Sequence, residues 1–178
     1  MGGSTDNEDE RTPIGPLEVI EQAAGLALAM AIWDLSLGCR VEPDLFSMRP
    51  GERPKVASFR AEDYSDAVQQ SLDLISRRFE EGYSLCALAY QGFEETEDGG
   101  RGQVIVVRVA WNSDDEAIIT VPWIDDDGTV AWLGPLAICE VKGTPDLSAM
   151  ERAVLAGLPL FPNGYRVWSE LKSKPKPH

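Results

Sequence analysis

Histidine is nearly absent from the sequence, because the only one, His178, is the last of 178 residues. An ordered imidazole is therefore not expected, which argues against the many enzymes that use histidine as a base or a metal ligand. The serine nucleophile elbow, the phosphate loop ending in Gly-Lys-Ser or Gly-Lys-Thr, and the glycine fingerprint of dinucleotide-binding folds are missing too. The sequence favours a protein that is not an enzyme, and it predicts no cofactor.

Positive charge is also scarce. The chain has 16 lysines and arginines against 30 aspartates and glutamates, which gives a formal net charge of −14. Binding to nucleic acid or to an anionic membrane is not expected, because both require a basic surface on the protein. A protein that mimics nucleic acid would be the one exception.

Cysteines are few, and the apolar runs are short. Cys39, Cys86 and Cys139 are odd in number and have no paired metal-binding spacing. The unbroken run of small and apolar residues at 23–33 has eleven residues, too few to span a bilayer, and acids precede it instead of the lysines of a signal peptide. These features predict a cytoplasmic protein with free and mostly buried thiols.

What the sequence does contain is a strand-rich segment between residues 83 and 141. Runs rich in valine, isoleucine, tyrosine and tryptophan alternate with short clusters of glycine and acidic residues, as in antiparallel sheets. The runs are 83–93, 103–111, 117–124 and 129–136, with a short fifth run at 137–141. Asp98-Gly99-Gly100 and Asp127-Gly128 supply the residues that tight turns need. The segment therefore predicts a four- to five-stranded antiparallel meander.

Both faces of this sheet are predicted to be apolar. In the second run, hydrophobic side chains alternate onto both faces, and Arg108 is the only charged residue. Such a sheet must be covered on each side by helices, a second sheet or a partner chain, so a homodimer is expected. Pro122 cannot donate a ladder hydrogen bond and is expected at a bulge or an unpaired edge position.

Helices are predicted at residues 17–35, 61–81 and 145–156. The first is apolar on most sides, and Gly25 would let another helix approach closely. The second is amphipathic and ends at Gly82, and the third begins with Thr144 as its cap and Pro145 in its first turn. Residues 41–55 are predicted to be an irregular loop and 56–59 a short extended piece. Residues 161–171 are predicted to form a turn, Pro162-Asn163-Gly164, and then a strand or a short helix.

The fold class predicted from these elements is α+β, with the two N-terminal helices packed on one face of the sheet. The C-terminal helix is expected at an edge or on the second face. Residues 16–171 are predicted to form a single domain, because 43% of the chain is hydrophobic and can supply a core of ordinary size. Residues 1–15 are predicted to be a disordered acidic tail, and residues 172–178 a basic mobile tail.

The acidic residues are unevenly distributed. Residues 82–141 contain eleven acids and two bases, whereas residues 142–178 contain three acids and six bases. In a meander, the first and third connections emerge at the same end of the sheet. We call the seven carboxylates of these two connections the acidic rim: Glu94, Glu95, Glu97, Asp98, Asp125, Asp126 and Asp127. Their shared negative potential suits a basic protein surface, a divalent cation or the chain's own lysine tail.

The function that these features favour is a non-catalytic binding module of the inhibitor, immunity or adaptor type. It would dock a basic protein through the acidic rim. The competing interpretation is that these acids are solvated loop residues, which keep the sheet soluble and prevent pairing at its edges.

The alternative function is a small-ligand-binding protein or a carboxylate-based, metal-dependent hydrolase. A ligand pocket would be lined by Trp123 or Trp132, although tryptophans on strands more often lie in the core. The hydrolase would use Glu94, Asp98, Asp125 and Asp127 as metal ligands. No metal site is assigned, because the aspartates lack the spacing of a calcium loop.

Overall fold

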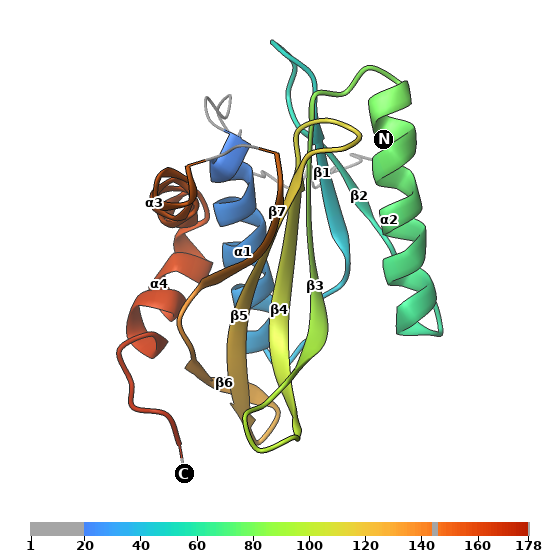
Figure 1. Cartoon of the computed structure of the whole chain (residues 1–178). Helices are drawn as coiled ribbons and strands as arrows, with labels where there is room; N and C mark the ends of the chain where they lie inside the picture. Colours follow the sequence, from blue (N-terminus) through green and yellow to red (C-terminus); the bar gives the residue numbers. More distant parts are fainter. Residues whose placement is uncertain (1–19, 144–145, 178) are drawn as a thin grey trace, which may run out of the picture.

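The computed structural model describes residues 20–143 and 146–177, so the predicted N-terminal tail at 1–15 lies outside the described residues. These residues form an α+β fold around one antiparallel sheet (Figure 1). The helices are α1 (Ile20–Ser36), α2 (Tyr64–Glu80), α3 (Leu147–Gly157), the 3-10 helix η1 (Leu158–Leu160) and α4 (Pro162–Leu171). The strands are β1 (Asp44–Met48), β2 (Lys55–Ser58), β3 (Leu85–Glu95), β4 (Arg101–Ala110), β5 (Glu116–Asp126), β6 (Thr129–Leu133) and β7 (Ala137–Lys142).

The order of the strands in the sheet is β2-β1-β3-β4-β5-β6. The strands β3 to β6 follow the predicted meander, in which each strand lies next to the one before it. The meander ends there, because β7 turns back and pairs with the first half of β5, at residues 116–120. On the other side of the sheet, β1 and β2 add two strands beyond β3.

The prediction of an irregular loop at residues 41–55 is wrong, because β1 lies within it. Leu45 and Phe46 are both buried, one on each face of the sheet, as successive residues of a central strand must be. The sequence signal was weak, because the strand has only five residues, shows no alternation of apolar and polar side chains and lies between prolines. The predicted extended piece at 56–59 is confirmed as β2.

Pro122 lies where β5 passes from one neighbouring strand to another. β5 pairs with β7 as far as Thr120 and with β6 from Trp123 onward, so Pro122 has no opposite residue on this side in the described strands. Its carbonyl faces the same side and accepts a hydrogen bond of 2.7 Å from the Gly134 N–H. The missing proline N–H therefore costs no ladder hydrogen bond at this unpaired position.

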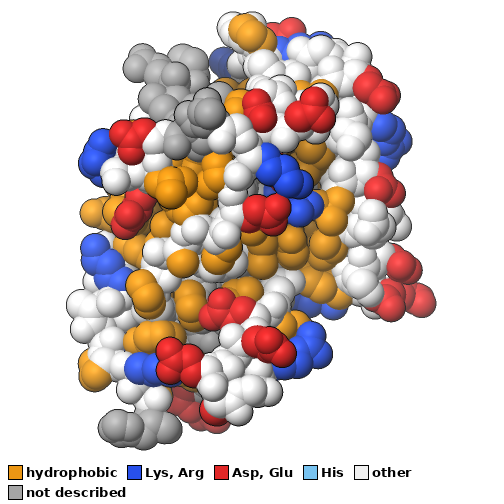
Figure 2. All heavy atoms as spheres, in the orientation of Figure 1, with side chains coloured by type: hydrophobic (Ala, Val, Ile, Leu, Met, Phe, Trp, Pro, Cys, Tyr) orange, Lys and Arg blue, Asp and Glu red, His pale blue; other side chains and the backbone are white. Residues whose placement is uncertain are grey.

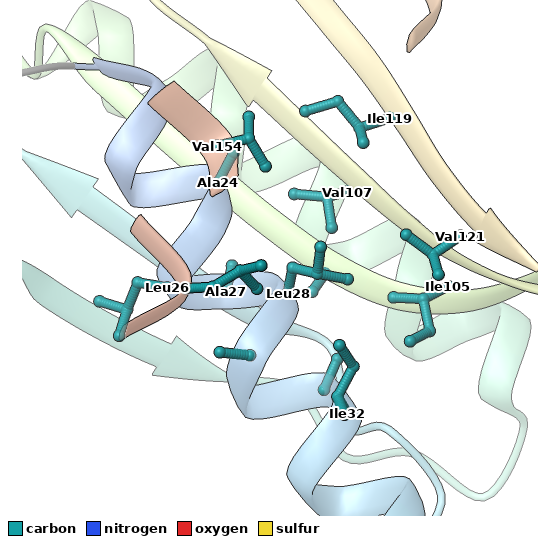
Figure 3. Packing of buried hydrophobic residues seen from close by; sticks show 14 of the residues in the cluster. Ala24, Leu26, Ala27, Leu28, Ile32, Ile105, Val107, Ile119, Val121 and Val154 are labelled. Atoms are coloured by element: carbon teal, nitrogen blue, oxygen red, sulfur yellow. The ribbon is translucent and has the colours of Figure 1, made fainter. Parts of the chain in front are cut away.

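The main core lies between α1 and one face of the sheet. In Figure 3, Leu28 and Ile32 of α1 point toward Ile105 and Val107 of β4, and Val154 of α3 lies beside Ala24 of α1. Each fully buried leucine or isoleucine contributes about 1.5–3 kcal/mol to the stability of the fold. Because α3 and α4 cover the outer side of α1, this helix is enclosed on nearly every side.

The two N-terminal helices lie on opposite faces of the sheet (Figure 1), so the prediction that they share one face is wrong. α2 packs on β1 and β3 over a second, smaller core of Leu45, Cys86 and Leu88. The difference follows from the two sequences. α1 is apolar on all sides and fits an interior position, whereas α2 has one apolar stripe and a solvated face, which suits an outer layer.

The C-terminal segment is helical, and the predicted turn at Pro162-Asn163-Gly164 is wrong. Pro162 occupies the first turn of α4, where a missing N–H leaves no helical hydrogen bond unmade. A Cβ added to Gly164 would lie 1.8 Å from the carbonyl oxygen of Ala29 in α1. This glycine therefore serves the close approach of two helices and not a turn.

The predicted end of α2 at Gly82 is confirmed, whereas the predicted cap of α3 is not. The Asp63 carboxylate caps α2 by accepting a 2.8 Å hydrogen bond from the Ser65 N–H, and Gly82 follows the helix with a φ of +87°. In α3 the cap is Asp146 and not Thr144, which lies with Pro145 outside the described residues. No helix in the described ranges is both long enough and apolar enough to cross a membrane.

All three cysteines are free thiols. Cys86 is buried between α2 and the sheet, where burial raises the pKa of its thiol to about 11. Cys39 and Cys139 are exposed, so the prediction of mostly buried thiols is wrong. Cys39 follows the end of α1, and Cys139 lies on the edge strand β7.

Candidate functional site

The two connections that carry the acidic rim emerge at the same end of the sheet (Figure 1). The pairing of β4 with β5 fixes this arrangement, because Gln103 near the start of β4 lies opposite Trp123 near the end of β5. Gln103 also donates a 3.3 Å hydrogen bond from Nε2 to Asp125 Oδ1 and so ties the end of β5 to β4. Six of the seven rim residues are exposed, and Glu94 is half-buried.

Local backbone geometry holds both acidic connections in place. Asp127 and Gly128 have positive φ angles of 50° and 83°, as the Asp-Gly turn predicted from the sequence requires. In the other connection, hydrogen bonds from the Thr96 hydroxyl and the Gly100 N–H lower the pKa of the Asp98 carboxyl. The charge of Lys176 lowers this pKa further. Asp98 is therefore fully ionised at neutral pH.

The C-terminal residues 172–177, which we call the lysine tail, pack against Trp132. The Trp132 indole N–H donates a 3.1 Å hydrogen bond to the carbonyl oxygen of Lys174. The Lys176 Nζ lies 5.8 Å from the centre of the Trp132 ring, within the range of a cation–π interaction. Since Lys176 also acts on Asp98, the chain brings its own positive charge close to the acidic rim.

The carboxylates named as metal ligands lie in two separate hairpins: Glu94 at the end of β3 with Asp98 in the turn after it, and Asp125 at the end of β5 with Asp127 in the turn after it. In the part of the chain that the structure describes, no three histidine, cysteine, aspartate or glutamate side chains are grouped as ligands of one ion. The acidic rim is a set of separate surface charges. Such an arrangement attracts a multivalent basic surface more readily than it coordinates a single cation.

The two tryptophans named as pocket residues have different surroundings. Trp123 is 8% exposed and belongs to the core beneath α1. Trp132 is half-buried and lines a cleft of about 460 Å³ with Leu155 of α3, Trp168 of α4 and the lysine tail. Of the two, Trp132 is the one beside an opening.

A second cleft, of about 340 Å³, was not predicted from the sequence. It lies between the flank of α2 and the strands β4, β5 and β7, and we call it the α2 cleft. Figure 2 shows hydrophobic side chains in the recess between the central strands and α2. Its charged residues are Arg108, Asp114, Glu116 and Lys142. The sequence signal that could have located it is Arg108, the one charge in an otherwise apolar run.

A group of carboxylates near the end of α1 was also missed. Burial raises the pKa of the Asp34 carboxyl to about 6, and the negative charges of Asp44 and Glu42 raise it as well. These residues come from the end of α1 and the start of β1, which the sequence assigned to a helix and to a loop. Their proximity depends on the position of β1, which was not predicted.

No protein-family model, no curated protein and no solved structure matches this chain. The geometry and charge of the surfaces described above are therefore the basis for a functional proposal.

Proposed function

We propose that the protein is a non-catalytic binding module that docks a basic protein through the acidic rim. The observation that carries the proposal is the gathering of seven carboxylates at one end of the sheet, beside the lysine tail that packs on Trp132. The positive charge of Lys176 favours the ionised form of Asp98 in this rim. A lysine- or arginine-rich segment of another protein would present the same chemistry.

The expected mode of binding follows from the exposure of the rim. An exposed ion pair contributes only about 0–1 kcal/mol, so affinity would come from several lysines or arginines acting together. Such a surface accelerates association with an oppositely charged partner and makes the affinity depend strongly on salt. An extended basic segment fits better than a compact one, because the seven carboxylates are spread over the strand ends and turns of two hairpins.

The lysine tail would compete with such a partner. Lys174 and Lys176 are held by Trp132, next to the rim, so a bound basic segment must displace them or share the site. A chain truncated after Leu171 should therefore bind the basic segment more tightly than the full chain.

The free, exposed thiols of Cys39 and Cys139 fit a reducing compartment, and we place this function in the cytoplasm.

The test is the affinity of a fluorescently labelled octalysine peptide, measured by anisotropy at low and at physiological salt. Replacing Asp125, Asp126 and Asp127 together by asparagine should weaken binding about tenfold at low salt and flatten its salt dependence. The matched control, Glu52→Gln with Asp73→Asn and Glu80→Gln, removes three exposed acids from other surfaces. Equal losses in the two triple variants, or no binding to the wild-type protein, would overturn the proposal.

Small-ligand binding is the second candidate function, and the two clefts beside Trp132 and α2 favour it. The metal-dependent hydrolase is not proposed further, because its four carboxylates belong to two separate hairpins and form no ligand group among the described residues. A homodimer is not needed by the proposal. Helices of the same chain cover one face of the sheet and the β1 and β3 part of the other, which removes part of the reason for expecting one.

A further inference from the structure

The α2 cleft exists because α2 covers only part of its face of the sheet. This helix packs on β1 and β3, and the face continues beyond it across β4, β5 and β7. Leu72, Ile75 and Phe79 of α2 form an apolar wall, and the loop between β4 and β5 closes one end. The volume of about 340 Å³ is within the range of small-molecule sites.

Arg108 gives the cleft a defined chemistry. Its side chain is 26% exposed, and its Nε is buried without a hydrogen-bond partner among the described residues. The nearest acid is Glu116, whose Oε1 lies 3.8 Å from an Arg108 terminal nitrogen, too far for a strong hydrogen bond. A buried donor without a partner is costly, so Arg108 has the capacity to receive an acceptor from a ligand.

Because Lys142 also pairs with Glu116, Arg108 can form an ion pair with the carboxylate of a ligand. The Lys142 Nζ lies 3.5 Å from the same Oε1 of Glu116 and 3.8 Å from Glu140, so Glu116 keeps a cationic neighbour when Arg108 turns to a ligand. The guanidinium group binds a carboxylate with two parallel hydrogen bonds, which a lysine cannot do. The cleft therefore combines a bidentate anion donor with apolar side chains of α2 in the same lining.

We propose that the α2 cleft is a binding site for small organic carboxylates with an aromatic or branched apolar body. The carboxylate pairs with Arg108, and the apolar body lies against Leu72, Ile75 and Phe79. The site is separate from the acidic rim, because residues 112–114 of its lining belong to the β4–β5 connection, at the other end of the sheet. Ligand binding at the α2 cleft can therefore be tested independently of the docking function of the acidic rim.

The test is a titration with phenylacetate, followed by calorimetry and by amide chemical shifts. Benzyl alcohol and inorganic phosphate serve as probes that lack the charge or the apolar body. Phenylacetate should shift amides of residues 72–79 and 108–116, and the two other probes should bind at least about tenfold more weakly. No binding of phenylacetate at millimolar concentration, or shifts confined to other parts of the chain, would overturn the proposal.

Variants separate this site from non-specific binding. Arg108→Met keeps the aliphatic packing and should raise the Kd at least about tenfold, while Arg108→Lys should restore only part of the affinity. Ser76→Phe should fill the cleft and abolish binding, whereas Gln70→Phe adds the same ring to an exposed part of α2 that does not line the cleft. If Arg108→Met does not fold, the comparison of Ser76→Phe with Gln70→Phe tests the proposed site. Equal affinities of these two variants would contradict the proposed site.

Discussion

Gly25 of α1 and Gly157 of α3 approach so closely that a Cβ added to Gly25 would lie 2.7 Å from the Gly157 Cα. The same added atom would lie 2.2 Å from the carbonyl oxygen of Val154. Backbone meets backbone at this contact, so no flexible side chain can move aside. The close approach that Gly25 predicted from the sequence is thus made within one chain, and α1 is enclosed by α3 without a partner.

We expect Gly25→Ala and Gly157→Ala each to lower the free energy of unfolding by about 3 kcal/mol, because the two helices must separate to admit a methyl group. Chemical denaturation followed by circular dichroism measures this change. Ser169→Ala, at an exposed position of α4, is the control and should change stability by less than about 0.5 kcal/mol. Wild-type stability in either glycine variant would contradict the packing of α1 against α3.

Tyr64→Phe should destabilise the protein by about 1–2 kcal/mol. The Tyr64 hydroxyl donates to the Val41 carbonyl oxygen at 2.9 Å and accepts from the Gln91 N–H at 2.7 Å, so it joins α2 to β3 and to the segment before β1. Removing it leaves both backbone groups without this partner. Tyr165→Phe, at an exposed tyrosine, should leave the unfolding midpoint unchanged, and equal effects of the two variants would argue against the bridging role.

Asp34→Asn should stabilise the protein at pH 8 and have no effect near pH 3.5. The pKa of Asp34 in the folded state is about 6, above the ordinary value of 3.8, so the ionised form is disfavoured in the fold. The destabilisation appears as the pH rises from about 4 to about 6 and is constant above that.

We expect a gain of about 1 kcal/mol at pH 8, less than the full shift would give, because Asp34 is only partly buried. Thermal melts of the variant and the wild type at both pH values measure it. Glu170→Gln, which removes an exposed charge from α4, should show no such pH-dependent gain. A gain that is equal at pH 3.5 and pH 8 would rule out ionisation as its cause.

Two thiols should react rapidly with a disulfide reagent in the native protein, and the third should react only on unfolding. Cys39 and Cys139 are exposed, whereas Cys86 is buried and burial raises the pKa of its thiol to about 11. The double variant Cys39→Ser with Cys139→Ser should therefore lose the fast phase. A fast phase that persists in this variant would mean that the α2 side of the sheet is open at Cys86.

The parts of the fold that the sequence predicted are those fixed by local patterns. Strands β3 to β6 were found because each run is rich in valine, isoleucine, tyrosine or tryptophan and is bounded by turn residues such as glycine and aspartate. The acidic rim could be inferred for the same reason, since the first and third connections of the meander place Asp98 and Asp127 at one end of the sheet. The stripe of α2 and its end at Gly82 are also local properties of the chain.

The parts that were missed depend on contacts between distant segments. β1 has five residues, and its pairing with β3 decides that it is a strand. The opposite placement of α1 and α2 depends on how the chain crosses the sheet through β1 and β2. Gly164 was predicted to form a turn because the approach of Ala29 cannot be read from its neighbours. The α2 cleft was missed because it results from where α2 stops covering the sheet.

The docking of a basic segment at the acidic rim is tested most directly by mapping where such a segment binds. The measurement is the change in backbone amide shifts when an octalysine peptide is added to the chain truncated after Leu171. The largest changes should fall at residues 94–103 and 123–129, and they should fade as salt is raised. Changes of similar size spread over all exposed acids, or centred on another surface, would contradict the docking function.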